Sequence, residues 1–174
     1  AFVAALEATG FVDTPILGAQ QISAKYARER IAELLKLKGD ASITAVTKQR
    51  VRDLVAETIE SGDSLQTLIK RLREDLVFSR YRAEMIARTE TGNALGQGSL
   101  ISFESQGFAG KRWLTQGDDK VCNICKAGAA DGVIPLDEAF SNGFAAPSPH
   151  PNCRCKLEPA RELPRVLSGN GRRA

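Results

Sequence analysis

The sequence is poor in several residue types that active sites and membrane proteins use. It has one histidine, one tryptophan and one methionine in 174 residues. No apolar run is long enough to span a bilayer, so we expect no membrane partner. We find no secretory signal peptide, although a chain that opens at Ala1 suits a processed product or a fragment.

The net charge is small and excludes few classes of function. The net charge is +3, with 43% hydrophobic and 26% charged residues, which is ordinary for a soluble globular protein. Such a balance permits contact with nucleic acid without arguing for it. The length suits one medium domain or two small ones.

All four cysteines and the only histidine lie in one short stretch. Cys122 and Cys125 form C-x-x-C, and His150, Cys153 and Cys155 follow as H-P-N-C-R-C. Zinc takes about four sulfur or nitrogen ligands in a tetrahedron, and a C-x-x-C turn lets two thiolates bind one ion. We therefore predict a structural Zn²⁺ site, with these five residues as candidates for four positions.

The sequence leaves the choice among the candidates open. His150 and Cys153 have the spacing of a tight turn, which the prolines on either side of His150 would stiffen. Cys153 and Cys155 would face the same side of an extended segment. Free or disulfide-bonded thiols are the alternative, since four cysteines allow three connectivities. A chain of this size does not need such staples, and the cysteines are confined to one end, which favours a reduced protein with zinc.

The front of the chain has the periodicity of helices. We expect helices over about 22–37, from about 44 to 62, from 65 onward, and over about 79–105. Their apolar positions recur three and four residues apart: Ile22, Tyr26, Ile31, Leu34 and Leu35; then Val51, Leu54, Val55 and Ile59; then Leu65, Leu68, Ile69 and Leu72. Asp63 or Ser64 is placed to cap the third helix.

The predicted helix over 79–105 has an unusual middle. Small and hydrogen-bonding residues interrupt its apolar stripe, and the shared face comprises Ile86, Thr89, Asn93, Gly96, Leu100 and Phe103. Such a face suits close approach to another backbone. We interpret Arg88 and Glu90 as a packing and ion-pair feature that ties this helix to the next module, with catalysis or anion binding as the alternative.

After Gly107 the composition changes to that of a small, loop-rich β module. Residues 111–115 and 132–136 are predicted strands, the first with the only tryptophan on one face, and 141–151 must be irregular. A thin core of this kind would gain on the order of 10 kcal/mol from a structural zinc. The residues after Leu157 show no periodicity.

These features predict an α+β fold in which a long helix leads from a helical region into a small β module stabilised by a Cys/His zinc site. We divide the chain into an N-terminal arm over 1–20, a helical region over 21–107, the zinc-stabilised module over 108–158, and a C-terminal tail over 159–174.

Four motifs in fixed order carry a resemblance to a known family. They are I-A-R-T-E-T over 86–91, K-R-W over 111–113, D-D-x-V-C-x-x-C over 118–125, and H-P-N-C-R-C over 150–155. In this order and spacing, the region 65–157 resembles the Mu F-like head morphogenesis proteins, which are minor capsid proteins of tailed bacteriophages and prophages. The resemblance implies a virion protein made in the bacterial cytoplasm. It also implies action in procapsid assembly near the portal vertex, with the portal protein and other capsid proteins as partners.

The rival hypothesis is a zinc-supported nuclease or toxin-like effector packaged in the virion. Such enzymes need a histidine as general base and further groups for a catalytic metal. If His150 binds zinc, no base remains; if it is the base, the metal site falls to Asp118, Asp119, Asp131 and Asp137. Five competing ligands favour a closed site, so we predict no catalytic residue. Weak nucleic-acid contact through basic helices remains a secondary expectation.

Overall fold

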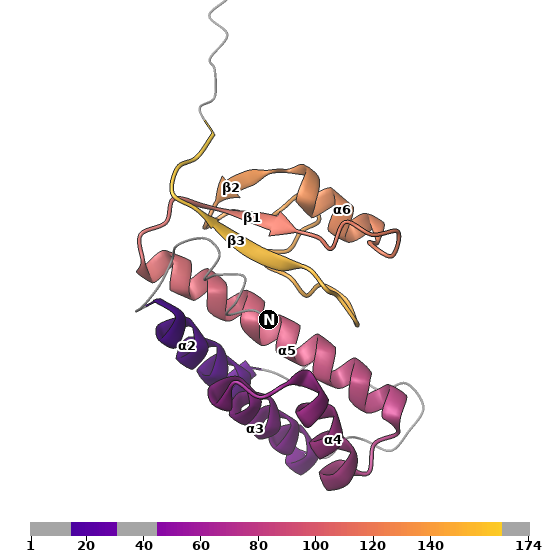
Figure 1. Ribbon diagram of the computed structural model, residues 1–174. Helices are drawn as coiled ribbons and strands as arrows, with labels where there is room; N and C mark the ends of the chain where they lie inside the picture. The colour runs from indigo at the N-terminus through magenta and orange to yellow at the C-terminus, as the bar shows by residue number, and fades with distance from the viewer. Residues whose placement is uncertain (1–14, 31–44, 165–174) are drawn as a thin grey trace, which may run out of the picture.

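The computed structural model describes residues 15–30 and 45–164. In these residues the elements are α2 (Pro15–Arg30), α3 (Ala45–Ser61), α4 (Leu65–Leu76), α5 (Arg80–Ser105), β1 (Gly110–Leu114), α6 (Asn123–Ala130), β2 (Val133–Pro135) and β3 (Lys156–Ala160). Helices α2, α3 and α4 lie on one side of the long α5, and the sheet with α6 lies on the other (Figure 1). The predicted α+β fold, with a long helix that leads into a small β module, is confirmed.

Helices α3 and α4 bury the faces that their periodicity predicts. The core of this half includes Val51, Leu54, Val55 and Ile59 of α3 and Leu68, Ile69 and Leu72 of α4. Each such side chain contributes about 1.5–3 kcal/mol when it is fully buried. Ser64 caps α4 by accepting a hydrogen bond from the Thr67 amide at 3.2 Å, and Ser79 caps α5 in the same way.

Helix α2 differs from the prediction. It begins at Pro15, so residues 15–20, which we expected in an arm, are helical, and residues 31–37 of the predicted helix lie outside the described residues. Its buried face is made of Ser23, Ala24 and Ala27, whereas Ile22 is only half-buried. These small residues let α2 approach α5 so closely that a Cβ on Gly98 would lie 2.7 Å from the Ser23 Cα.

The three strands form an antiparallel sheet in the order β2-β1-β3. Strands β1 and β2 were predicted, but β3 was not, and it runs two residues past the expected start of the tail. Its sequence, K-L-E-P-A, contains a proline and little β propensity. Pairing with β1 makes it a strand, with Leu157 opposite Trp113, and its edge position tolerates Pro159.

The β module has its own small core around Trp113. The Trp113 ring, which is 1% exposed, meets Phe140 edge-on with the ring centroids 5.2 Å apart. Lys111, on the same strand, is fully buried, and its Nζ donates a hydrogen bond to the Leu136 carbonyl at 2.7 Å. Burial lowers the pKa of Lys111, because desolvation disfavours its charged form.

The polar stripe of α5 contacts the β module, as its composition predicts. A Cβ on Gly96 would lie 1.9 Å from the Pro147 carbonyl oxygen, so only glycine permits this approach. Thr89 Oγ1 accepts a hydrogen bond from the Asn152 amide at 3.0 Å, and Leu100 and Phe103 pack against the core around Trp113. Helix α5 therefore contributes to both cores.

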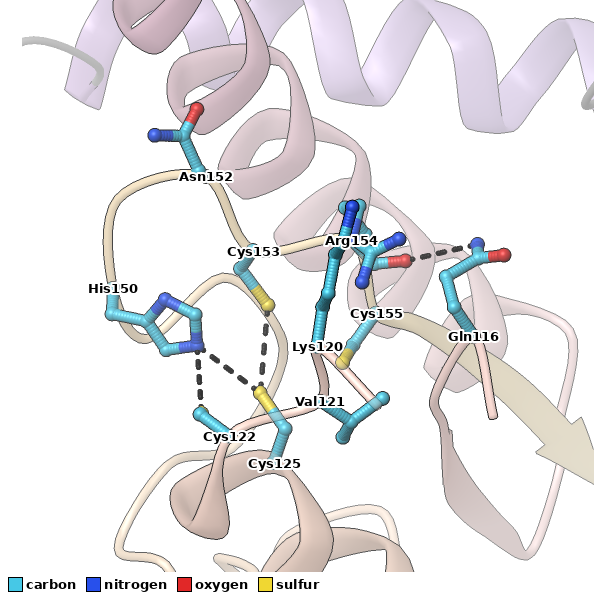
Figure 2. Close-up of a pocket in the computed structure, with 10 residues that line it drawn as sticks. All are labelled: Gln116, Lys120, Val121, Cys122, Cys125, His150, Asn152, Cys153, Arg154 and Cys155. Carbon is cyan, nitrogen blue, oxygen red and sulfur yellow. Dashed lines mark hydrogen bonds between the residues drawn. The ribbon is translucent and has the colours of Figure 1, made fainter. Parts of the chain in front are cut away.

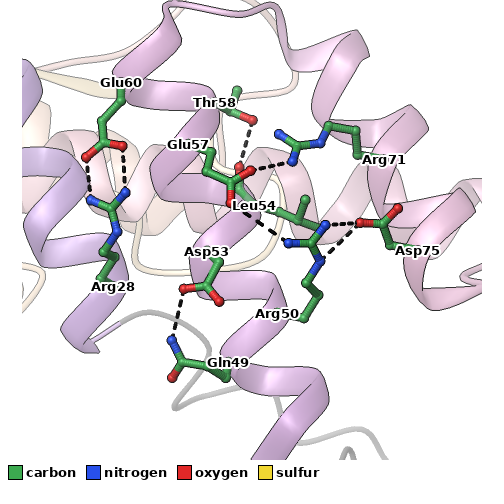
Figure 3. A network of polar contacts seen from close by, with 10 residues as sticks. All are labelled: Arg28, Gln49, Arg50, Asp53, Leu54, Glu57, Thr58, Glu60, Arg71 and Asp75. Atoms are coloured by element: carbon green, nitrogen blue, oxygen red, sulfur yellow. Dashed lines mark hydrogen bonds and ion pairs between the residues drawn. The ribbon is translucent and has the colours of Figure 1, made fainter.

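Ion pairs join the solvent-facing sides of the helices (Figure 3). Arg28 of α2 pairs with Glu60 of α3, Arg50 of α3 pairs with Asp75 of α4, and Arg71 of α4 pairs with Glu57 of α3. Because these side chains are about 30–43% exposed, each pair contributes about 1 kcal/mol or less. None of the described helices is both long enough and apolar enough to cross a membrane.

Candidate metal centre

The C-x-x-C pair lies at the start of a helix that the sequence analysis missed. Cys122 is the residue before α6, and Cys125 lies in the first turn of α6 and is 2% exposed. The sequence N-I-C-K-A-G-A-A has no apolar stripe that would predict a helix. Tertiary packing forms it instead, because Gly128 lies so close to Trp113 that a Cβ there would be 3.1 Å from the indole ring.

The second half of the cluster is carried by the loop over 150–155. The Cys153 amide donates to the His150 carbonyl across a tight turn, as the spacing predicts. Asn152 has the left-handed φ of 60° that this turn requires and that asparagine tolerates. Two hydrogen bonds from Arg154 to Asp118, at 2.6 and 2.7 Å, hold the loop to the segment that precedes Cys122.

The structure brings all five predicted residues together (Figure 2). His150 Nε2 lies 3.1 Å from the Cys122 Sγ and 3.2 Å from the Cys125 Sγ, and the Cys125 and Cys153 sulfurs are 3.7 Å apart. In a zinc tetrahedron with bonds of about 2.3 Å to sulfur and about 2.0 Å to nitrogen, the edges measure about 3.5–3.8 Å. The sulfur–sulfur distance matches such an edge, and the two nitrogen–sulfur distances are shorter than an edge by about 0.3–0.4 Å, so these groups can hold one metal ion after a shift of that size.

The orientation of His150 leaves its Nε2 available to a metal. Its Nδ1 lies 2.9 Å from the Pro151 carbonyl, which can only accept a hydrogen bond, so Nδ1 carries the proton. The Nε2 then faces the two thiols, and metal-binding histidines commonly use one nitrogen while the other donates to a carbonyl. This arrangement is typical of a metal ligand.

The electrostatics of the cluster favour thiolates at some positions. A backbone hydrogen bond from Cys125 lowers the pKa of Cys122, and a hydrogen bond from the Cys155 thiol lowers the pKa of Cys153 to about 5. Burial raises the pKa of Cys125 to about 12, and the contact with Cys153 raises the pKa of Cys155. Because thiolates are the metal-binding form, a metal would displace the remaining protons.

The pKa of His150 reflects opposing effects. Burial alone would lower it, because a desolvated imidazolium is disfavoured. The hydrogen bond to Pro151 and the charges of Cys153 and Cys122 outweigh burial, so the pKa is raised overall. The electrostatics of this histidine are therefore governed by the cysteine cluster around it.

Two buried donors fit a metal-bound form of the cluster. Within the described part of the chain, Ser148 Oγ and Trp113 Nε1 have no hydrogen-bond partner of normal geometry. Ser148 is close enough to Cys153, and Trp113 to Cys155, to favour the thiolate of each. Thiolates are better acceptors than thiols, so Ser148 suits a deprotonated, metal-bound Cys153, and Trp113 can donate to the Cys155 sulfur.

A cavity of about 30 Å³ lies among these groups, which is enough for one ion or one water molecule. It is lined by Gln116, Lys120, Val121, Cys122, Cys125, His150, Asn152, Cys153, Arg154 and Cys155. The sequence analysis did not identify Thr89, Ser148 and Trp113 as supports of the cluster. The one signal in the sequence was the position of Thr89 in the polar stripe of α5.

Arg88 and Glu90 occupy different surroundings. Arg88 is exposed and reaches the Asn152 side chain at 3.5 Å, whereas Glu90 is 5% exposed. Two residues apart on a helix are separated by about 200°, so they face opposite sides of α5. This geometry agrees with packing roles for both residues, on opposite faces of the helix.

The fold and the cluster define a class: an α+β protein in which a helical bundle carries a small antiparallel sheet closed by a candidate metal centre. A family model described as Phage Mu protein F like protein matches residues 49–158, from α3 into β3, and the chain belongs to this family. Searches of curated proteins and of solved structures returned no match. Membership indicates a role in phage head morphogenesis, a place in the virion, and other phage structural proteins as partners.

Proposed function

We propose that this protein is a minor capsid protein that acts in procapsid assembly near the portal vertex, and that its Cys/His cluster is a structural zinc knot. The family match supports the assembly role. The observation that carries the zinc knot is the convergence of Cys122, Cys125, His150, Cys153 and Cys155 in one cluster.

The position of the cluster explains what a metal would stabilise. The loop that carries His150 and Cys153 also packs on α5, through Asn152 against Thr89 and through Pro147 against Gly96. A metal that joins this loop to α6 would therefore fix the β module against the long helix. The helical bundle then serves as the docking element, and the β module serves as a rigid end piece.

Zinc is the metal that this donor set favours. Thiolates and a neutral imidazole are soft or borderline ligands, which suit zinc rather than the oxygen-seeking magnesium or calcium. Five candidates for four positions leave no open position for substrate or water. The cluster thus supports a structural role rather than a catalytic one.

The contacts of His150 and of two aspartates count against the nuclease alternative. Both nitrogens of His150 are engaged, Nδ1 with Pro151 and Nε2 with the two thiols, so neither is placed to act as a general base. Asp118 is held by Arg154, and Asp131 accepts a hydrogen bond from the Ser141 amide. DNA cleavage that is lost in His150→Ala while zinc is retained would restore the nuclease hypothesis.

Nucleic-acid contact remains a secondary prediction. Arginines 28, 50, 71 and 80 are paired with carboxylates, which reduces the positive potential of the helices. We expect at most weak DNA binding that falls steeply with salt, because phosphate contacts release counterions. Affinity that stays flat between low and moderate salt would contradict this contact.

The assembly role is tested by incorporation into procapsids. The full chain is produced together with the capsid, scaffolding and portal proteins of the same phage, and the purified particles are quantified by mass spectrometry. We expect the protein in procapsids that contain the portal and its depletion from matched particles assembled without it. Equal incorporation into both kinds of particle would contradict placement near the portal, and absence from both would contradict the capsid role.

A further inference from the structure

The candidate metal centre offers five groups to an ion that takes four, and the five are not equivalent. They form two groups of three whose ligand atoms lie within 4.8 Å of one another: Cys122, Cys125 and His150 in one, and Cys125, Cys153 and Cys155 in the other. Cys125 belongs to both. Its sulfur is therefore within 4.8 Å of the ligand atom of every other candidate.

Three observations place His150 among the residues that bind the ion. Its Nε2 contacts both sulfurs of the C-x-x-C pair, at 3.1 and 3.2 Å. Its Nδ1 is engaged with Pro151, so the free lone pair belongs to Nε2. The turn that carries it is held to α5 through Thr89, which fixes its backbone in place.

Cys153 is the better fourth ligand. Its sulfur lies 3.7 Å from the Cys125 sulfur, which matches the sulfur–sulfur edge of about 3.8 Å in a zinc tetrahedron. It is 5% exposed and shares its tight turn with His150. The backbone thus presents His150 and Cys153 as a pair to the C-x-x-C pair.

Cys155 lies on the other side of the cluster. In Figure 2 its side chain lies beyond Cys125 from the histidine, whereas the side chain of Cys153 lies on the same side of Cys125 as the histidine. The next residue, Lys156, already pairs with Leu114 in the sheet, which restrains the backbone at this position. From there its sulfur lies within 4.8 Å of the sulfurs of Cys125 and Cys153.

We infer that the resident ligands are Cys122, Cys125, His150 and Cys153, and that Cys155 is an outer thiol that lies beside Cys153 without binding the metal. Cys155 enters the coordination sphere only when His150 is lost, by releasing its proton to solvent and binding through its thiolate. This inference rests on the proposed function, because it presupposes a bound metal.

X-ray absorption at the zinc edge decides on the wild-type protein, without any variant, whether His150 is among the ligands. The reduced full chain is loaded with one equivalent of zinc, and the sulfur and nitrogen atoms bound to the metal are counted. We expect three sulfurs and one nitrogen. A shell of four sulfurs would overturn the inference while leaving the zinc knot in place, whereas a wild-type chain that binds no zinc would overturn both.

Matched variants then test the role of the outer thiol. Cys155→Ser should leave the three-sulfur, one-nitrogen shell unchanged and weaken zinc binding by no more than about tenfold, the lower end of what an outer-shell loss costs. His150→Ala should still bind zinc but with four sulfurs. The double variant should bind more than about tenfold more weakly than either single variant. A nitrogen that persists in His150→Ala, or a sulfur lost in Cys155→Ser, would overturn the inference.

Discussion

Two glycines of α5 provide a test of how the bundle and the β module fit together. Gly92 and Gly96 lie in one helix, so replacing either by alanine gives the same gain of about 1 kcal/mol in helix propensity. Their surroundings differ. A Cβ on Gly92 would make ordinary contacts with the Ser148 side chain, at 3.4 Å, and with the Cys153 carbonyl oxygen, at 3.9 Å, whereas a Cβ on Gly96 would overlap the Pro147 backbone.

The expected magnitude follows from that overlap. The Pro147 carbonyl would have to retreat by about 1 Å, and forcing extra atoms into a packed site costs about 1–3 kcal/mol. Propensity cancels between the two variants, so Gly96→Ala should be less stable than Gly92→Ala by about 1–3 kcal/mol. For a chain of this length that difference corresponds to between about 2 and 12 °C in Tm.

The assay is denaturant unfolding of the zinc-loaded protein, with Gly92→Ala as the matched control. Because Pro147 lies three residues before His150, Gly96→Ala should also weaken zinc binding, by about tenfold or more, as losses of supporting contacts do. If Gly96→Ala proves as stable as Gly92→Ala and binds zinc equally well, the loop over 146–148 does not pack on α5 and the proposed junction is wrong.

Three further predictions concern the metal, the buried lysine and the loop contact. Removal of zinc by a chelator, or Cys125→Ser, should unfold the β module and leave α3, α4 and α5 largely formed, as seen by circular dichroism together with Trp113 fluorescence; equal loss of helix would show one cooperative unit. Lys111→Met should be no less stable than wild type at pH 7, because it removes a desolvated charge, whereas Lys111→Ala should cost about 2 kcal/mol or more. Since the folded pKa of Lys111 is lowered, wild-type stability should gain a contribution as pH rises from that folded pKa towards about 10.4, and Lys111→Met should lack it. Thr89→Val should cost about 1 kcal/mol in thermal unfolding by leaving the Asn152 amide unpaired, and exposed Arg88→Ala should cost less; the reverse order would show that Arg88 carries the contact.

The elements that the sequence predicted are those whose stability is local. Helices α3 and α4 bury regular apolar stripes, and Ser64 and Ser79 mark the starts of α4 and α5 through their own side chains. The start of α2 was predicted too late, and the buried face of its described part consists of Ser23, Ala24 and Ala27, which carry no hydrophobic periodicity. Small residues make close helix contacts, but a pattern based on large apolar side chains does not register them.

The elements that the sequence missed depend on contacts far along the chain. Strand β3 exists because it pairs with β1 more than forty residues earlier, and α6 exists because Gly128 fits against Trp113. Local propensity contains neither contact, and Pro159 even argues against a strand. Both elements flank the cysteine cluster, so the sequence identified the candidate ligands without the framework that positions them.

The framework also explains why one long helix can serve both halves. Its apolar residues near Ile86 belong to the bundle core, Leu100 and Phe103 belong to the core around Trp113, and the polar stripe with Gly96 lies between them against the loop that carries His150. A change at the candidate metal centre therefore acts on α5 through backbone contacts rather than through a flexible linker. Loss of the metal should weaken any partner contact that needs the β module held at a fixed orientation to the bundle, even where the partner touches no cysteine.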